Sequence, residues 1–240
     1  MAQLPDWQPL EGGVRIPDGT GSGRVVAVVA SERAVAAGWA GAAALDLARA
    51  WSQVGGRVIL ADGALHYPTL HKLAEIENTE GLSDAALFGA SVRRVARPLD
   101  GGAFFLITAG TAVADANTVP GSPRWGRLLE GFQEAGVKLL LFVRDGDSGC
   151  AAFLGSASDI IVLADRGERA PAAVRDLEGM VRAVAGPDTA TAAGTAGGSG
   201  SRPPVEWTAS SDEGRKRVKL LGIAAVAFVV LLVLVFVLAL

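Results

Sequence analysis

Cysteine is nearly absent from this sequence. Among 240 residues there is one, Cys150, so no internal disulfide can form. A lone thiol is typical of a reducing compartment, because proteins of oxidising compartments commonly use disulfides. The opening residues, MAQLPDWQPLEGG, have neither a basic start nor an apolar stretch, and so show no signal peptide. We therefore expect the globular part of the chain to be cytoplasmic.

An excess of positive charge is also missing. The formal net charge is −3, and a group of cations lies together at Arg215, Lys216, Arg217 and Lys219. The rest of the chain is therefore more acidic than the total suggests. Nucleic-acid-binding proteins usually present a basic surface, so we expect no nucleic acid partner.

One long segment lacks polar side chains. Residues 220–240, LLGIAAVAFVVLLVLVFVLAL, contain no charge, no proline and no hydrogen-bonding side chain. A helix of that length covers roughly 30 Å, the thickness of a bilayer's hydrocarbon core. A buried core helix is the less favoured alternative, because such helices keep a polar face. The sequence predicts one C-terminal transmembrane helix, and the cations before it place the N-terminal domain in the cytoplasm.

Composition divides the chain into four parts. Residues 1–23 are rich in Pro, Gly and Asp and predict a loose arm. Residues 24–185 form the predicted folded domain. Residues 186–214 have the Gly, Ala, Thr, Ser and Pro content of a flexible linker, with an r.m.s. reach of about 30 Å. Residues 215–240 are the basic flank and the membrane span.

Short apolar runs recur through the folded domain. The first is rich in valine and is typical of a strand buried on both faces. Helix-like stretches separate the runs, so the order predicts βαβ units, a mainly parallel sheet and a three-layer α/β domain. The predicted strands are residues 24–30, 57–61, 104–108, 137–143 and 159–164.

Three helices are expected between or after these strands. The first runs from about Val35 to Gln53 and ends before Gly55 and Gly56. The second covers residues 123–135, where Ser122 is a predicted N-cap and Pro123 lies in the first turn. The last helix is expected over residues 171–184.

The loop after the first strand lacks what a phosphate site needs. A phosphate loop uses glycines for close backbone approach, a lysine for the β- and γ-phosphates and a hydroxyl for magnesium. The sequence here is ASERAVAAGWAGAAALDLARAW, and the first lysine of the whole chain is Lys72. The loop therefore predicts no ordinary nucleotide site.

Several fragments nevertheless follow the order and spacing of a known family. The fragments are ADGALHYPTLHKL at 61–73, GLSDAALFGAS at 81–91, Arg97-Pro98 and Ala109-Gly110. On these fragments the region from about Arg24 to Gly167, a little over half of the chain, resembles the ParA/MinD-like ATPases and is most similar to the cytoplasmic domain of bacterial polysaccharide-associated tyrosine autokinases. That resemblance implies a P-loop NTPase-like fold, here with degenerate motifs.

The departures from the family fall on its working residues. Aligned through Asp46-Leu47-Ala48, the family's phosphate-loop lysine corresponds to Ala40, and its hydroxyl positions to Gly41 and Ala42. Phosphoryl transfer depends on positioning and on charge neutralisation by Lys, Arg and metal. Losing these groups together indicates a pseudo-enzyme.

The acidic residues are reduced as well. The family's paired aspartates after the second strand correspond to Asp62 and Ala64, and an arginine of the family corresponds to His66. After residues 137–143, Val143 or Arg144 stands where the family has a metal-organising aspartate, with Asp145 slightly beyond. Asp62 and Asp145 are therefore the only cofactor-binding remnants. The family's tyrosine-rich tail is also missing, since the chain has one tyrosine, Tyr67.

Other candidate sites are weaker. Arg33 could reach a phosphate, but an exposed loop arginine is the simpler interpretation. Residues 144–149 place two carboxylates in a glycine-rich turn that could hold a cation, although turn formation alone accounts for them. His66 and His71 lack further metal ligands. Cys150 has no neighbouring base and is interpreted as a small buried hydrophobe.

The sequence thus predicts a membrane-anchored, catalytically degenerate kinase-like scaffold or regulator, with no catalytic residue, metal or cofactor. By resemblance it acts in bacterial polysaccharide synthesis or export at the inner membrane, with a membrane protein partner and a possible homo-oligomer. The alternative is an active tyrosine autokinase or a MinD-like positioning ATPase. Either would bind ATP through backbone N–H groups and Asp62, with magnesium on Asp145.

Overall fold

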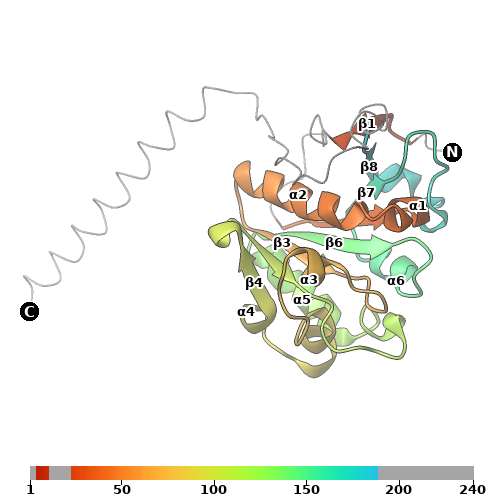
Figure 1. Ribbon diagram of the computed structural model, residues 1–240. Helices are drawn as coiled ribbons and strands as arrows, with labels where there is room; N and C mark the ends of the chain where they lie inside the picture. Colours follow the sequence, from red (N-terminus) through yellow and green to blue (C-terminus); the bar gives the residue numbers. More distant parts are fainter. Residues whose placement is uncertain (1–3, 11–22, 189–240) are drawn as a thin grey trace, which may run out of the picture. The chain divides into compact units, whose positions relative to one another are not determined.

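The computed structural model describes residues 4–10 and 23–188. They form an eight-stranded sheet in the order β1-β8-β7-β2-β6-β3-β5-β4 (Figure 1). Every neighbouring pair is parallel except β5 and β4. The strands are β1 Trp7–Pro9, β2 Val25–Ala30, β3 Val58–Asp62, β4 Ala96–Leu99, β5 Phe104–Ile107, β6 Lys138–Arg144, β7 Asp159–Leu163 and β8 Val181–Gly186.

Helices cover both faces of the sheet and make the three predicted layers. Helices α1, α2 and α3 pack on one face, and η2, α4, α5 and α6 pack on the other. The α-helices are α1 Glu32–Ala36, α2 Ala40–Gln53, α3 Leu70–Leu73, α4 Val92–Val95, α5 Pro123–Glu134 and α6 Cys150–Leu154. The π-helical turn is η2 Asp84–Phe88, and the 3-10 turns are η3 Asp100–Gly102, η4 Ala116–Thr118, η5 Ala172–Val174 and η6 Glu178–Met180.

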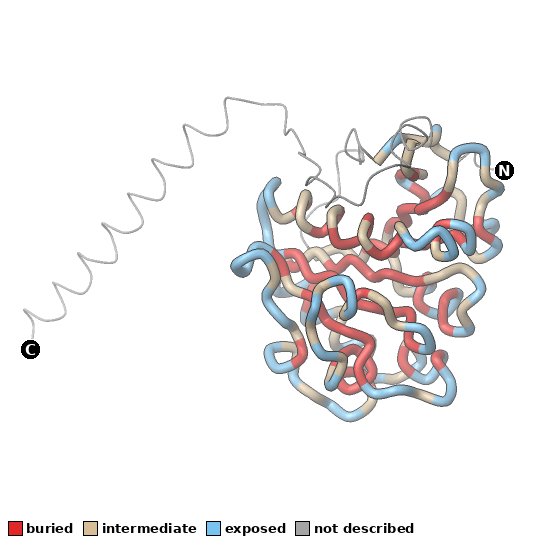
Figure 2. Tube along the Cα trace, in the orientation of Figure 1, coloured by how far each residue is buried: buried red, intermediate tan, exposed pale blue. Residues whose placement is uncertain are grey.

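The valine-rich β2 is buried on both faces, as its sequence predicts. Figure 2 shows that buried segments gather at the centre of the domain and exposed ones around it. Val26 and Val28 pack into the cluster under α2, whereas Ala27 and Val29 pack into the cluster under α5. Successive side chains of a strand point to opposite faces, so a strand with helices on both sides needs apolar residues at every position.

The five predicted strands are all present, with ends shifted by one residue at most sites. The predicted cap of α5 is also confirmed, because the Ser122 side chain accepts a hydrogen bond from the Arg124 N–H and Pro123 opens the helix. Gly55 and Gly56 follow α2 with φ of 109° and 90°, a conformation that L side chains rarely adopt.

The end of the domain differs from the prediction. Residues 171–184 do not form a helix but two 3-10 turns followed by β8, which pairs with β7. Along β8, Val181, Ala183 and Ala185 are buried while Arg182 is exposed, which is the alternation of a strand. The sheet pairing is non-local, so it overrides the helical propensity of this alanine-containing stretch.

Two further expectations change at the N-terminal side. The predicted helix from Val35 to Gln53 is two helices, α1 and α2, separated at Gly38, whose φ is +79°. The predicted loose arm contains an edge strand, β1. It is held by the Trp7 indole, which donates a hydrogen bond to the Ala164 carbonyl at 2.9 Å and packs under the Arg166 guanidinium.

The predicted linker, residues 186–214, lies outside the described residues from 189 onward, and Gly186 at its predicted start belongs to β8. The predicted span at 220–240 also lies outside the described residues. Within residues 4–10 and 23–188, no helix is long and apolar enough to cross a membrane. The membrane helix therefore stays a prediction from the sequence.

Candidate functional site

The carboxyl ends of β2, β3, β6 and β7 lie at the same end of the sheet, which is called the edge loop region below, and β2 lies between β6 and β7. The chain runs from β2 toward β3 on one side and reaches β7 on the other, so this is a topological switch point. Open α/β sheets bind ligands at such a point. The residues here are Ser31 after β2, Asp62 at the end of β3, Asp145 after β6 and Asp165 beyond β7.

The loop between β2 and α2 is folded as a helix. With Ala40 in the lysine position, the phosphate-loop pattern puts its two glycines at Ala34 and Trp39. The Ser31 hydroxyl caps α1 by accepting from the Ala34 N–H at 3.1 Å. The Ala37 N–H donates to the Arg33 carbonyl, and the Gly38 N–H donates to the Val35 carbonyl. These N–H groups are bonded within the loop, whereas a phosphate cradle leaves such groups free for its ligand.

The start of α2 is packed against protein. Ala40 is only 2% exposed. A Cβ on Gly41 would lie 2.6 Å from Cδ1 of Leu73 in α3, so the two helices touch where a hydroxyl side chain would otherwise stand. A side chain at the hydroxyl position would therefore meet α3.

Asp62 is fully buried, and its carboxylate holds the loop that follows β3. One oxygen accepts from the Ala64 N–H at 3.1 Å, and the other accepts from the N–H groups of Thr69 and Leu70 at 3.3 and 3.2 Å. Burial raises the pKa of Asp62 to about 6, although these hydrogen bonds and the Arg144 charge oppose the rise. In the described structure this remnant anchors a loop.

Asp145 serves a different loop. Its two oxygens accept from the N–H groups of Ala172 and Ala173, at 3.0 and 3.1 Å, and so cap the 3-10 turn η5. Asp62 pairs in register with Phe142, so Asp145 lies at the same edge of the sheet. The structure thus brings both predicted remnants to the same end of the sheet, the edge loop region, and their hydrogen bonds go to separate loops.

A hydrogen bond closes the switch point between β2 and β7. The Ser31 hydroxyl donates to Oε2 of Glu168 at 2.8 Å, and the same oxygen accepts from the Asp165 N–H at 3.0 Å. The β2 loop is therefore fastened to the β7 loop. This contact leaves no signal in the sequence, because 137 residues separate its partners.

Arg144 is a second residue that sequence reasoning undervalued. Its Cζ lies 5.3 Å from the centroid of the Tyr67 ring, and its Nη1 donates to the Tyr67 carbonyl at 3.4 Å. Its Nε lies 4.0 Å from Oδ2 of Asp147. Burial raises the pKa of Asp147, and the charges of Arg144 and His66 oppose this. A cation that ends a buried apolar strand was the available signal.

The other sequence candidates occupy ordinary positions. Arg33 is exposed on α1. Cys150 is 3% exposed, and burial raises the pKa of its thiol to about 12, which agrees with a small buried hydrophobe. Burial also lowers the pKa of His71. Among the residues that the structure describes, no group of three or more His, Cys, Asp or Glu side chains is placed to hold a metal.

Two of the fragments that carry the family resemblance, residues 81–91 and Ala109-Gly110, contact each other at another place in the domain. Asp84, in the Gly81–Ser91 fragment, accepts from the Gly81 N–H at 2.8 Å and from the N–H and hydroxyl of Thr111 at 3.0 and 2.6 Å. Burial alone would raise the pKa of Asp84, but these bonds hold it below its usual value. A Cβ on Gly81 would lie 2.1 Å from the Thr108 carbonyl oxygen, and one on Gly110 would lie 2.2 Å from the Asp84 carboxylate.

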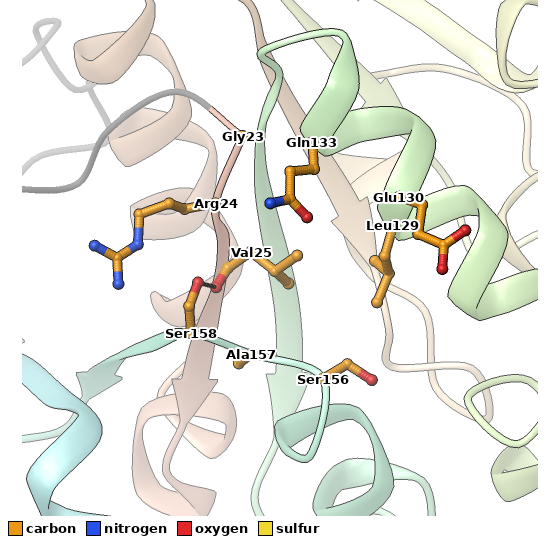
Figure 3. A pocket seen from close by; sticks show the side chains of 9 residues that line it. All are labelled: Gly23, Arg24, Val25, Leu129, Glu130, Gln133, Ser156, Ala157 and Ser158. Carbon is orange, nitrogen blue, oxygen red and sulfur yellow. Dashed lines mark hydrogen bonds between the residues drawn. The ribbon is translucent and has the colours of Figure 1, made fainter.

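A shallow pocket lies at the opposite, amino-terminal edge of the sheet (Figure 3). Its volume is about 410 Å³. The Ser158 hydroxyl in it donates to the Val25 carbonyl, and the Ser156 hydroxyl accepts from the Trp125 indole, so both are used by the fold. None of the motif residues lines it. The lining residues are Gly23, Arg24, Val25, Leu129, Glu130, Gln133, Ser156, Ala157 and Ser158.

The fold and the topological switch point together define a class of α/β protein. The chain is a three-layer α/β protein with the sheet order and switch point of a P-loop-like fold, and the loop between β2 and α2 contains the short helix α1. No protein-family model and no curated protein sequence matches the chain.

Solved structures share this fold. The chimeric protein CapA2B2 matches with a TM-score of 0.59 and 16% identity over 71% of this chain and 77% of that one. The kinase domain of the Escherichia coli tyrosine kinase ETK matches with the same score and identity over 71% and 69%. Cobyrinic acid a,c-diamide synthase from Mycobacterium smegmatis, bound to an ATP analogue and magnesium, gives 0.51 and 16% over 68% and 72%. These similarities confirm the fold that the resemblance implied.

Proposed function

We propose that this chain is a catalytically degenerate protein of the tyrosine-kinase-like α/β fold, which acts as a membrane-anchored scaffold or regulator. The observation that carries the proposal is the β2–α2 loop. The N–H groups of Ala34, Ala37 and Gly38 are bonded within the loop, the lysine position is a buried alanine, and the start of α2 packs against α3. Because phosphoryl transfer needs charge neutralisation and an open cradle, this loop supports binding to partners without catalysis.

The carboxylates support the same proposal. A magnesium site needs carboxylate oxygens that can turn to a shared ion. Asp62 and Asp145 each accept backbone hydrogen bonds with both oxygens, and they serve different loops. We infer no catalytic residue, resident metal or cofactor.

The proposed cellular role and location rest on the family resemblance and on the apolar C-terminal residues. Relatives with this fold include a bacterial tyrosine kinase, and the resemblance to polysaccharide-associated autokinases favours a role in bacterial polysaccharide synthesis or export. The apolar residues 220–240 and their basic flank favour single-pass anchoring in the inner membrane with the domain in the cytoplasm. A tether raises the effective concentration of membrane protein partners, which are the partners we propose.

A homo-oligomer is also proposed, and the fold restricts how it would form. The two outer strands of the sheet each contain a proline, Pro9 in β1 and Pro98 in β4. Proline lacks the N–H that sheet extension needs and is a common protection of sheet edges. Self-association would therefore use helical surfaces.

The alternative is an ATP-binding autokinase or a MinD-like ATPase with an unusual phosphate site. One observation favours it. A fully buried carboxylate whose pKa is raised to about 6, at the switch point of an α/β sheet, is a common feature of functional sites. Under this alternative Asp62 and Asp145 would give up their loop contacts to hold magnesium and nucleotide.

Calorimetric titration of the full chain in detergent micelles with Mg²⁺-ATP separates the two. We expect no heat of binding up to millimolar nucleotide, with an active kinase of the same fold as positive control. Micromolar binding that disappears in Asp62→Asn, in a variant that keeps the wild-type circular dichroism spectrum, would refute the pseudo-enzyme and establish the alternative.

The anchor needs its own test. We expect full-length protein to resist carbonate extraction from bacterial inner membranes and a chain ending at Val205 to be released. Protease added to the periplasmic side of spheroplasts should leave the domain intact. Extraction of the full chain by carbonate would contradict the membrane span and leave the nucleotide result unaffected.

A further inference from the structure

The turn η2 presents an aromatic side chain to solvent. Phe88 is 69% exposed, although the preceding residues Ala85 and Ala86 are buried. Gly89 follows with φ of +77°, which ends the turn and leaves Phe88 at its tip. A large apolar side chain that is exposed in this way packs little against its own domain. It therefore loses little packing when it moves from water into an apolar phase.

One arginine lies against this tip, and two more are exposed on helices α4 and α5 next to it in the chain or in contact with η2. The Arg124 guanidinium lies next to Gly89, and its Nη1 donates to the Leu87 carbonyl at 2.8 Å. Arg127 lies one helical turn further on the same side of α5, and Arg93 is exposed on α4. None of the three arginines forms an ion pair with a residue that the structure describes.

Acidic side chains are sparse at this place. The chain has no Asp or Glu between Asp84, which is buried, and Asp100. Arg94 is neutralised by Glu80, and Glu130 lies one turn beyond Arg127 on α5. The group Phe88, Arg93, Arg124 and Arg127, hereafter the Phe88 patch, is therefore a cationic aromatic surface on a chain of net charge −3.

We propose that the Phe88 patch is a membrane-contact surface for anionic phospholipid headgroups, with Phe88 entering the interfacial region. Charge complementarity supports this occupant, since arginines near an anionic leaflet each contribute to binding. A second support is the chain itself. Its apolar residues 220–240 carry a basic flank, and the proposed linker reach of about 30 Å holds the domain within range of the bilayer. The inference rests on the proposed tethering.

The test uses a chain ending at Val205 so that the apolar tail cannot insert. Residues 1–205 form a compact unit that holds the whole described sheet and both hydrophobic clusters. Co-sedimentation is measured with phosphatidylcholine vesicles that contain or lack phosphatidylglycerol. The variants are Phe88→Ala and the double variant Arg93→Gln with Arg127→Gln. The matched controls are Val54→Ala, where the side chain is 80% exposed, and Arg57→Gln.

We expect binding only to the vesicles with phosphatidylglycerol. One arginine near a charged leaflet corresponds to about five-fold in partitioning, so the double arginine variant should bind roughly 25-fold less tightly. Phe88→Ala should also weaken binding by about five-fold, because it removes the apolar side chain. Both controls should stay within about two-fold of wild type.

Three results would overturn the inference. They are no binding of wild type to anionic vesicles, an equal loss in the controls, and vesicle binding that is unaffected in the Phe88 patch variants. Capture of an acidic protein by the Phe88 patch without any lipid binding would assign the surface to a protein partner. Carbonate extraction of the full chain tests the tether separately, so the two failures can be told apart.

Discussion

Two regions of this domain contrast sharply. The β2–α2 loop departs from the phosphate-loop pattern at its glycine, lysine and hydroxyl positions, and it contains α1, within which the N–H groups of Ala34, Ala37 and Gly38 are bonded. Gly81 and Gly110 follow the resemblance and lie against each other, a contact called the Gly81/Gly110 junction below. At both glycines a side chain would collide with backbone or with the Asp84 carboxylate. The residues at Gly81 and Gly110 are those that the packing requires, whereas the β2–α2 loop does not carry the residue types of a phosphate loop.

The largest expected effect comes from the junction. In Gly81→Ala the new Cβ would lie 2.1 Å from the Thr108 carbonyl oxygen, which is backbone and cannot rotate away. We expect a loss of about 4 kcal/mol in the free energy of unfolding, measured by urea denaturation. Gly131→Ala in α5, where no atom lies within 4 Å, is the control. It should be neutral or stabilising by up to about 1 kcal/mol.

The second prediction addresses the loop. Ala40→Lys restores the missing charge but places it at a position 2% exposed. We expect a loss of about 3 kcal/mol from burying an unpaired cation, and no ATP binding by calorimetry, because the loop N–H groups stay bonded. Tight ATP binding by this variant would show that the lysine alone had been lost and that the loop remains a cradle.

The third prediction concerns pH and Asp62. Its folded-state pKa of about 6 lies above the ordinary value of 3.8, so the folded chain takes up the proton first as pH falls. Acidification from pH 7 to 5 should therefore raise this residue's contribution to the free energy of unfolding by roughly 1 to 2 kcal/mol. The change is measured as the difference between wild type and Asp62→Asn in urea denaturation across this range. A difference that falls on acidification would contradict the raised pKa.

The smallest effect is expected at the β2–β7 contact. Ser31→Ala removes the cap of α1 and the hydrogen bond to Glu168, and should lower the free energy of unfolding by about 1 kcal/mol. Ser31→Asp keeps a capping acceptor but sets a second carboxylate beside Glu168, so it should not rescue stability. Thermal unfolding of the pair measures the contact, and full rescue by Asp would show that only the cap matters.

The sequence predicted some parts of this site and not others for identifiable reasons. Asp62 was recognised as the acidic end of a buried strand, a local signal. The hydrogen bonds that the Asp62 carboxylate accepts from Ala64, Thr69 and Leu70 could not be predicted, because no local sequence pattern gives the path of the loop. By sequence, Arg144 stands out only as the residue at the position of the family's aspartate. Its contact with the Tyr67 ring follows from its position at the end of a strand.

Local pattern by itself determined the valine-rich and leucine-rich strands, the Ser122 cap and the stop at Gly55 and Gly56. Each of these follows from residues within a few positions, where steric and hydrogen-bonding preferences act directly. Tertiary structure decided β1, β8 and the helical loop after β2. A strand such as β8 gains its hydrogen bonds only from a distant neighbour, and a loop closes only when the groups across the sheet, here Ser31 and Glu168, are brought together.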